Sequence, residues 1–312
     1  MSLTLISSSK CHNGEVRRYS HQSAVNNCEM KFHVFVPGCI SDRPVPVLYF
    51  LSGLTCTDEN FITKACAIQG ANRENIMLVC PDTSPRGADV PTSTSDSFIG
   101  LGAGFYIDAT QEPWSKNYQM FSYITSELFN LVSSNFNVDK DRQSIFGHSM
   151  GGHGALISAF KKPGQYRSVS ALAPICDAPI FPAVTEYLGK DVSKHQEYCA
   201  HLLARTYNGP HLDILVDQGT SDDFLPKLFP ELLKEACAAN TQHITLSHHM
   251  REGYPHNYWF IQTFIEDHIA FPCQASQQSS LNAFKQACVW CSSLAGWHPI
   301  TCIHLYPGHV VD

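Results

Sequence analysis

Short apolar segments alternate with longer amphipathic segments along most of this chain. Several of the apolar segments are hydrophobic at successive positions, which is typical of strands that are buried on both faces. The predicted strands cover residues 32–36, 47–51, 76–80, 144–146, 168–172, 212–216 and 244–246. The amphipathic segments follow a period of 3.6 residues. They predict helices over residues 118–135, 150–160, 225–239 and 258–269.

This alternation predicts an α/β fold with a mostly parallel central sheet and helices on both faces. Residues 1–270 contain no internal repeat and no linker, so we interpret them as one domain. Residues 271–312 are rich in Ser, Gln, Cys and Pro and follow no clear period. We expect them to form a disordered C-terminal extension.

Composition narrows the possible classes of protein. The chain has 312 residues, of which 44% are hydrophobic and 16% charged, with a net charge of -7 and no basic stripe. Nucleic acid is therefore not expected as a partner. No apolar run approaches the roughly 20 residues of a membrane helix. The 13 cysteines follow no disulfide framework, and the start of the chain is a poor signal peptide. We expect a cytoplasmic protein.

The segment GHSMG at residues 147–151 matches the motif G-x-S-x-G. A predicted strand precedes it and a predicted helix follows it, which is the context of a nucleophile elbow. The serine must occupy a strained turn, and the flanking glycines remove the side chains that would collide there. Ser149 is therefore the candidate nucleophile.

A serine hydroxyl needs a base that accepts its proton, and histidine is the usual one. His256 lies in a loop ahead of the last predicted helix. The base is expected at this place in an enzyme whose serine lies on a nucleophile elbow. His148 and His153 flank the elbow, and we interpret them as packing residues. His248 and His249 follow the preceding strand and read as surface residues.

The acid that orients this histidine should follow the strand at residues 212–216. Asp217, Asp222 and Asp223 all lie in the segment that comes next, and spacing alone does not separate them. A carboxylate at this place would fix the tautomer of the imidazole and stabilise the imidazolium.

Two backbone N–H groups must also face the oxyanion of the tetrahedral intermediate. One is expected from Met150, the residue after the nucleophile. The other is expected from the loop after the strand at residues 47–51. Leu54 is our choice, because Gly53 lets the backbone turn toward the site.

Longer strings give the chain a specific resemblance. They are LSGLTCT (51–57), ENFITK (59–64), PDTSPRG (81–87), SIFGHSMGGHGALI (144–157), SALAPIC (170–176), YLG (187–189) and LDILVDQG (212–219), with GAGFY at 102–106 and EGY at 252–254. With these strings the sequence resembles the S-formylglutathione hydrolase (esterase D) family over about residues 3–270. The resemblance implies the α/β-hydrolase fold.

The resemblance also implies an activity. The family hydrolyses S-formylglutathione to glutathione and formate in formaldehyde detoxification, needs no metal or organic cofactor, and is commonly a homodimer. Its pattern falls on Ser149 and His256, and its string G-x-x-D-x-F implies Asp222 as the acid. It likewise implies Leu54 and Met150 as oxyanion donors.

The chain departs from the family in its acyl-pocket segment. Residues 177–189 read DAPIFPAVTEYLG, about four residues shorter than the family's segment and without its tryptophan and lysine. A broad-specificity carboxylesterase for small acyl groups is therefore the alternative function. Transfer of the acyl group to an acceptor other than water, and a catalytically inactive binding protein, are further alternatives. Pro255 replaces the family's aspartate before the histidine, and Cys56 matches a cysteine beside the family's active site.

The C-terminal segment contains the pattern C-x-x-C at residues 288–291, followed by further cysteine and histidine residues. This composition is compatible with zinc, but the spacing fits no strong finger pattern. We expect no metal site there.

Overall fold

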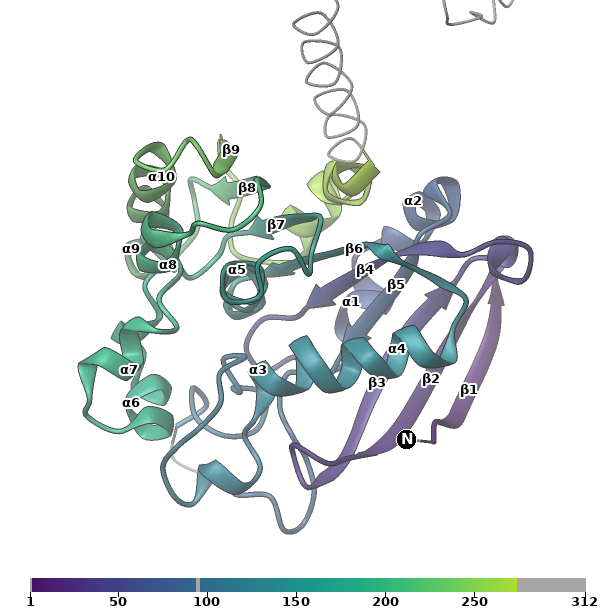
Figure 1. The fold of residues 1–312 in the computed structure, drawn as a ribbon, viewed down its shortest axis with the longest axis horizontal. Coiled ribbons are helices and arrows are strands. Elements are labelled where there is room, and N and C mark those ends of the chain that lie inside the picture. Colours follow the sequence, from purple (N-terminus) through teal and green to yellow (C-terminus); the bar gives the residue numbers. More distant parts are fainter. Residues whose placement is uncertain (1, 94–95, 274–312) are drawn as a thin grey trace, which may run out of the picture. The chain divides into compact units, whose positions relative to one another are not determined.

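The central sheet is mixed and mostly parallel (Figure 1). The computed structural model describes residues 2–93 and 96–273. Within these residues nine strands form one sheet in the order β1-β2-β3-β5-β4-β6-β7-β8-β9. The strands are β1 (Thr4–Cys11), β2 (Gly14–Ser23), β3 (Cys28–Val36), β4 (Val45–Leu51), β5 (Met77–Pro81), β6 (Val138–His148), β7 (Ser168–Leu172), β8 (Leu212–Gly219) and β9 (Ile244–Arg251). The pairs β1–β2, β2–β3 and β3–β5 are antiparallel, and the remaining pairs, from β5–β4 to β8–β9, are parallel.

Helices connect most of the parallel strands. They are α1 (Asn60–Lys64), α2 (Ala67–Glu74), α3 (Met120–Ser122), α4 (Phe129–Asn135), α5 (Met150–Lys161), α6 (Pro182–Leu188), α7 (Val192–Gln196), α8 (Ala200–Thr206), α9 (Leu225–Leu228) and α10 (Pro230–Ala238). Residues 258–273 are also helical. The short 3₁₀ segments are η1 (Gly38–Ser41), η2 (Trp114–Lys116) and η4 (Ala178–Ile180), and η3 (Tyr123–Leu128) is a π-helix.

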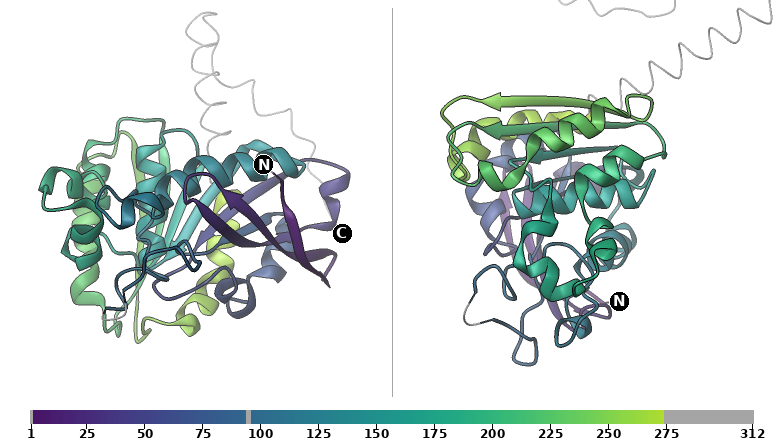
Figure 2. Two further views of the ribbon diagram at one scale, coloured as in Figure 1. Left: turned by 90° about the horizontal axis from the view of Figure 1, so that it is seen from below. Right: turned by 90° about the vertical axis from the view of Figure 1, so that its left-hand side faces the viewer.

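The helices cover both faces of the sheet (Figure 2). Tyr49 and Phe50 are successive residues of β4, so their side chains point to opposite faces. The Tyr49 ring stacks on Phe129 of α4, and the Phe50 ring stacks on Phe61 of α1. Helices α4 and α1 therefore lie on opposite faces, as the sequence predicted.

The same argument places the remaining helices that matter for the site. His268 of the C-terminal helix hydrogen-bonds to Ser170 of β7. The next residue, Ala171, points to the other face, where it lies beside Gly152 of α5. Helix α5 and the C-terminal helix thus cover opposite faces of the sheet.

The structure differs from the sequence prediction in several elements; helices α1, α2, α6, α7 and α8 were not predicted, and β6 begins before the expected strand at residues 144–146. Strands β1 and β2 were not predicted. The side chains of β1 are nearly all exposed, including those of Leu5 and Ile6, so this strand has no buried face that a hydrophobic pattern would mark. The helix expected over residues 118–135 contains the π-helical turns of η3 in its middle. The helix expected over residues 225–239 is interrupted at Phe229, whose φ of 53° is left-handed. Pro230 follows it, and a proline disfavours helical geometry in the preceding residue.

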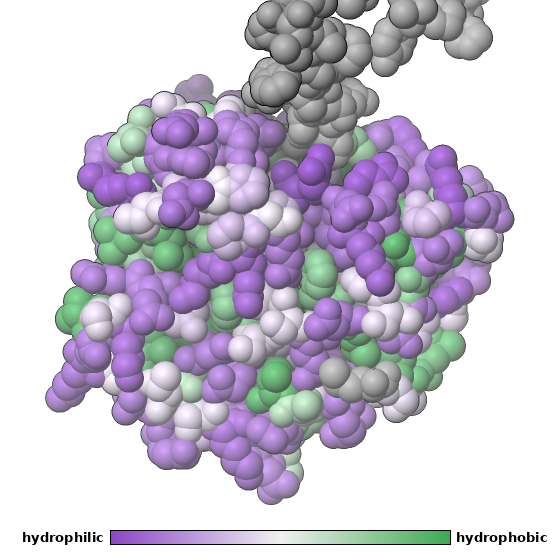
Figure 3. Space-filling view, in the orientation of Figure 1, coloured by the Kyte–Doolittle hydropathy of each residue, from purple (hydrophilic) through white to green (hydrophobic). Residues whose placement is uncertain are grey.

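Apolar side chains are mostly inside. On the face that Figure 3 shows, hydrophobic residues occur in small groups among hydrophilic ones. Among the described residues, no helix is long and apolar enough to cross a membrane. Of the extension expected over residues 271–312, residues 271–273 belong to the C-terminal helix, and the remainder, with the C-x-x-C pattern, lies outside the described residues.

Candidate active site

Ser149 occupies a sharp turn between β6 and α5. Its backbone has φ 59° and ψ -120°, a conformation that residues other than glycine rarely adopt. A Cβ atom on Gly147 would lie 2.2 Å from the carbonyl oxygen of Gly151. A Cβ atom on Gly151 would lie 1.9 Å from the carbonyl oxygen of Leu51. Both glycines are therefore required for the turn that presents the serine.

Ser149, His256 and Asp222 form a continuous row of hydrogen bonds. The Ser149 Oγ lies 2.8 Å from His256 Nε2, and His256 Nδ1 lies 2.7 Å from Asp222 Oδ2. With the proton on Nδ1, the imidazole donates to the carboxylate and accepts from the hydroxyl. This is the arrangement in which a histidine can take the serine proton.

The Asp222 carboxylate is buried and well supplied with donors. Its Oδ2 also accepts from Gln218 Nε2 at 2.9 Å, and its Oδ1 accepts from the Phe224 N–H at 2.7 Å. Burial acts to raise the pKa of Asp222, but the hydrogen bond and charge of His256, together with these donors, lower it overall. The group therefore remains a carboxylate beside the imidazole at neutral pH.

The structure separates the three candidate aspartates. Asp217 is buried and accepts from His249, Arg251 and His268, on the side of the C-terminal helix. Asp223 is exposed. Of the three carboxylates, that of Asp222 contacts His256.

The other candidate histidines do not contact the serine hydroxyl. The His148 ring centroid lies 4.5 Å from that of His256, and burial, followed by the charge of His256, holds the His148 pKa well below its usual value. His153 is fully buried, and burial lowers its pKa to about 3. His248 is half-buried, and His249 is exposed and bonded to Asp217.

Of the two expected oxyanion donors, Leu54 borders the pocket of the serine, and Met150 follows the serine directly in the chain. Leu54 lines that pocket together with Ser149, and Met150 is the first residue of α5. Neither backbone N–H has a hydrogen-bond acceptor within residues 2–93 and 96–273. The start of a helix leaves such N–H groups available for an anion.

A network that sequence reasoning missed holds the loop after β4. The Thr55 N–H donates to the Gly102 carbonyl at 2.9 Å, and the Tyr106 hydroxyl donates to the Ser52 carbonyl at 2.9 Å. The Cys56 carbonyl accepts from Arg86 Nη2 at 3.2 Å and from the Thr83 hydroxyl. The residues that hold this loop belong to the strings PDTSPRG and GAGFY. In the structure they position the backbone of this loop.

The row of hydrogen bonds opens into a pocket of about 390 Å³. Its apolar wall is formed by Phe98, Ile175, Phe181, Phe224 and Leu228. Phe181 belongs to the segment in which this chain departs from the family. Cys56 and Tyr258 also line the pocket, and burial raises the pKa of the Cys56 thiol.

The pocket is largely apolar, and none of the groups described so far forms a metal centre. Elsewhere in the described part of the chain, one group of metal-ligand side chains lies close together: Asp177, Cys199 and His201. It shares no residue with the pocket around Ser149.

Comparison with known proteins shows the family to which the chain belongs. A family model described as "Putative esterase" matches residues 23–271. S-formylglutathione hydrolase from Rattus norvegicus is 47% identical over 86% of this chain and 97% of its own length. The Arabidopsis thaliana protein of that name is 46% identical over 88% and 98%. A solved S-formylglutathione hydrolase from Agrobacterium tumefaciens matches with a TM-score of 0.83 and 43% identity, over 87% of this chain and 99% of that one. The predicted α/β-hydrolase fold is thereby confirmed, and the chain belongs to the S-formylglutathione hydrolase family of esterases.

Proposed function

We propose that this protein hydrolyses S-formylglutathione to glutathione and formate, with Ser149 as the nucleophile. One observation carries the proposal: the Ser149 hydroxyl, His256 and Asp222 are joined by hydrogen bonds of 2.8 and 2.7 Å beside an apolar pocket. The identity of this chain to proteins named S-formylglutathione hydrolase supports the choice of substrate.

In the first half of the reaction His256 takes the proton of Ser149, and the serine oxygen attacks the formyl carbon. Negative charge develops on the carbonyl oxygen, where the N–H groups of Leu54 and Met150 would stabilise it. The carbon–sulfur bond then breaks and glutathione leaves as its thiolate, which takes the proton from His256, so the imidazole is neutral again before the second half. A thiol has a pKa of roughly 8.5, so its thiolate departs with little help from an acid.

In the second half water attacks the formyl ester on Ser149. His256 again accepts a proton, formate leaves, and the serine recovers its hydrogen. Asp222 remains ionised throughout and holds the imidazole in the orientation that both steps use. The lowered pKa of Asp222 supports this role.

The experiment compares kcat/KM for S-formylglutathione with kcat/KM for acetyl and butyryl esters. The proposal predicts the highest value for S-formylglutathione, although a difference of one methylene group is worth only about 1–3 kcal/mol. Preference for the butyryl ester would favour the broad-specificity carboxylesterase instead. Product that depends on an added alcohol would favour acyl transfer.

Three finer statements belong to the same proposal. We propose that the enzyme acts in formaldehyde detoxification in the cytoplasm, that it works as a homodimer, and that residues 1–270 suffice for catalysis. Light scattering of the purified protein measures the oligomer, and cell fractionation measures the location. A chain ending at residue 272, where the compact unit ends, should keep the kcat of the full chain.

A further inference from the structure

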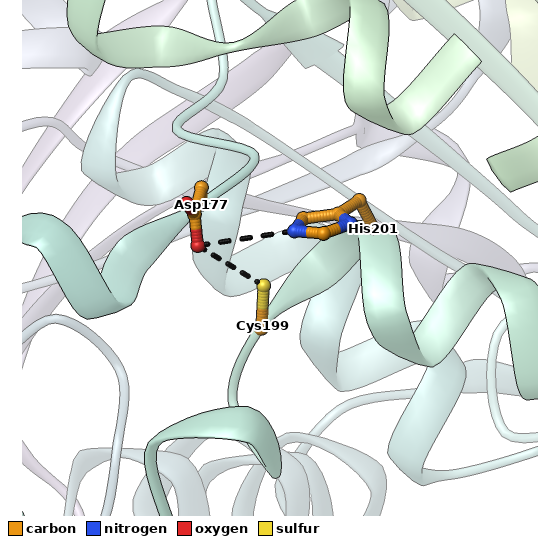
Figure 4. A group of neighbouring side chains, drawn as sticks. All are labelled: Asp177, Cys199 and His201. Atoms are coloured by element: carbon orange, nitrogen blue, oxygen red, sulfur yellow. Dashed lines mark hydrogen bonds and ion pairs between the residues drawn. The ribbon is translucent and has the colours of Figure 1, made fainter. Parts of the chain in front are cut away.

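Asp177, Cys199 and His201 bring three metal-ligand side chains together outside the catalytic pocket (Figure 4). One ligand atom from each lies within 4.8 Å of the other two. We propose that these three residues bind one zinc ion. The hydrolysis described above needs no metal, so this zinc would not take part in the chemistry.

The distances fit a tetrahedral ion. Zinc bonds of about 2.0–2.3 Å to N, O and S imply ligand-to-ligand distances of roughly 3.4–3.6 Å. Cys199 Sγ lies 3.4 Å from Asp177 Oδ1, and His201 Nε2 lies 3.8 Å from the same oxygen. Both distances are close to the tetrahedral value before any ion is added. Only the imidazole and the thiol must move closer to each other.

The donor set and the exposure of the three side chains also suit zinc. Thiolate, imidazole and carboxylate are the groups that zinc binds in proteins, and three of them leave a fourth position for water. Cys199 is buried, whereas the Asp177 and His201 side chains are 25% and 16% exposed. An ion can therefore reach the site from solvent. On binding, the Cys199 thiol releases its proton to solvent and becomes a thiolate.

The backbone holds the three residues together without a metal. Cys199 directly precedes α8, His201 lies in the first turn of α8, and Asp177 follows β7. The His201 N–H donates to the carbonyl of Cys176 at 3.3 Å, which ties α8 to the segment that carries Asp177. Little rearrangement is needed, so the entropic cost of assembling the site is small.

Nearby positive charge opposes a cation. The start of α8 carries the positive end of its backbone dipoles. Burial is the main cause that lowers the pKa of His201, and the charge of Arg205 lowers it further. The Asp177 carboxylate and the Cys199 thiolate supply two negative charges that offset it. A site with two anionic ligands favours a dication.

The position suggests what the ion would do. Asp177 follows Cys176, whose N–H donates to the Leu228 carbonyl at 2.8 Å, and Ile175 donates its N–H to the Ser149 carbonyl at 3.3 Å. Ile175 and Leu228 line the pocket, so zinc would hold that wall in place. This consequence rests on the proposed function, whereas zinc binding itself does not.

The test is a titration of the metal-free, full-length protein with Co²⁺, a spectroscopic substitute for zinc. We expect one Co²⁺ per chain, a sulfur-to-cobalt charge-transfer band, visible bands of tetrahedral intensity, and displacement by Zn²⁺. Cys199→Ser should abolish the charge-transfer band. His201→Ala and Asp177→Asn should weaken binding at least tenfold, since even the loss of an outer partner costs 10–100-fold.

Controls separate this site from other thiols. The double variant Cys288→Ser, Cys291→Ser removes the C-x-x-C of the C-terminal segment, and Cys66→Ser removes an exposed thiol. Both should keep the full band. Absence of the band from the unaltered protein, its persistence in Cys199→Ser, or its loss in either control would overturn the proposal. If Cys199→Ser does not fold by circular dichroism, unchanged affinity in both His201→Ala and Asp177→Asn would overturn it. The readout is spectroscopic, so a failure of the proposed hydrolase activity would leave this result unaffected.

Discussion

Gly102 lies directly against Thr55, and the contact fixes the loop that carries Leu54. The Gly102 carbonyl accepts the Thr55 N–H at 2.9 Å, and a Cβ atom on Gly102 would lie 2.8 Å from the Thr55 Cα. Gly102 also has a φ of +76°. The loop that carries Leu54, the proposed oxyanion donor, therefore depends on a residue that lies almost fifty positions away along the chain.

Gly102→Ala should lower kcat by about tenfold or more. Loss of a full oxyanion donor costs roughly 3 kcal/mol, and displacement of the loop should cost a substantial fraction of that. The matched control is Gly164→Ala, because Gly164 has a φ of +80° but only an ordinary contact, 3.6 Å from Pro210. The control should lower thermal stability and leave kcat unchanged. Equal kcat values in the two variants would show that the position of this loop does not affect catalysis.

Asp222→Asn should lower kcat by about 10³–10⁴-fold while the protein remains folded. An amide cannot stabilise the imidazolium and favours the wrong tautomer of His256. Asp223→Asn is the matched control, since Asp223 is adjacent but exposed, and it should stay within twofold of the unaltered enzyme. Steady-state kinetics decide between them. A larger loss in Asp223→Asn would mean that the acid is misassigned.

Asp217 should make the stability of the fold depend on acidity. Burial acts to raise its pKa, but hydrogen bonds from His268 and Arg251 and their charges lower it to about 2. An unfolded aspartate has a pKa of about 3.9. The carboxylate therefore contributes stability above pH 4, and the contribution is lost as the pH falls toward 2.

Urea unfolding at a series of pH values between about 5 and 2 measures this contribution. The free energy of unfolding should fall with decreasing pH in the unaltered protein and fall less steeply in Asp217→Asn. Asp223→Asn provides the comparison for an exposed carboxylate. The same slope in Asp217→Asn as in the unaltered protein would show that other groups cause the acid sensitivity.

Cys56 should be alkylated slowly at neutral pH and faster as the pH rises. Burial raises the pKa of its thiol, and the thiolate is the form that reacts. An adduct would fill part of the pocket and abolish hydrolysis. Mass spectrometry after iodoacetamide treatment at pH 7 and at pH 9.5 measures the adduct alongside the remaining activity.

The Cys56→Ser variant supplies the comparison for that experiment. Whatever activity it retains should be insensitive to the reagent at both pH values. Inactivation of Cys56→Ser at the rate of the unaltered enzyme would place the reactive thiol elsewhere, for example at the exposed Cys66.

Some parts of the site could be predicted because they depend on local sequence. The turn at Ser149 needs glycine on both sides, and the structure shows the collisions that any other residue would cause. The place of His256 beside Ser149 could be predicted because the order of strands and helices fixes which loop faces the elbow. Strong apolar runs likewise gave the central strands, from β3 to β8.

Other parts depend on contacts that no local pattern encodes. Spacing could not separate Asp217 from Asp222, because the difference lies in their partners: His268 and Arg251 for one, His256 for the other. The network around the oxyanion loop consists mainly of bonds to backbone carbonyls, which leave no signature in the residues that accept them. The side chains of strand β1 are exposed on both faces, including Leu5 and Ile6, so its sequence has no alternation of buried and exposed positions.

The interruption of the predicted helix at Phe229 has a signal in the local sequence. Pro226 and Pro230 were visible in the sequence, and a proline inside a helical pattern signals an end or a kink. The hydrophobic period continues across residues 225–239, but the helix is divided at Phe229, directly before Pro230.

The central claim is that the hydroxyl of Ser149 performs the attack on S-formylglutathione. The most direct test is the rate of S-formylglutathione hydrolysis by purified Ser149→Ala, measured beside the unaltered enzyme and a no-enzyme blank. The account predicts a rate lower by about 10⁴-fold or more, with only the residual catalysis that binding and the oxyanion donors provide. A Ser149→Ala enzyme that keeps a tenth of the original kcat would contradict it.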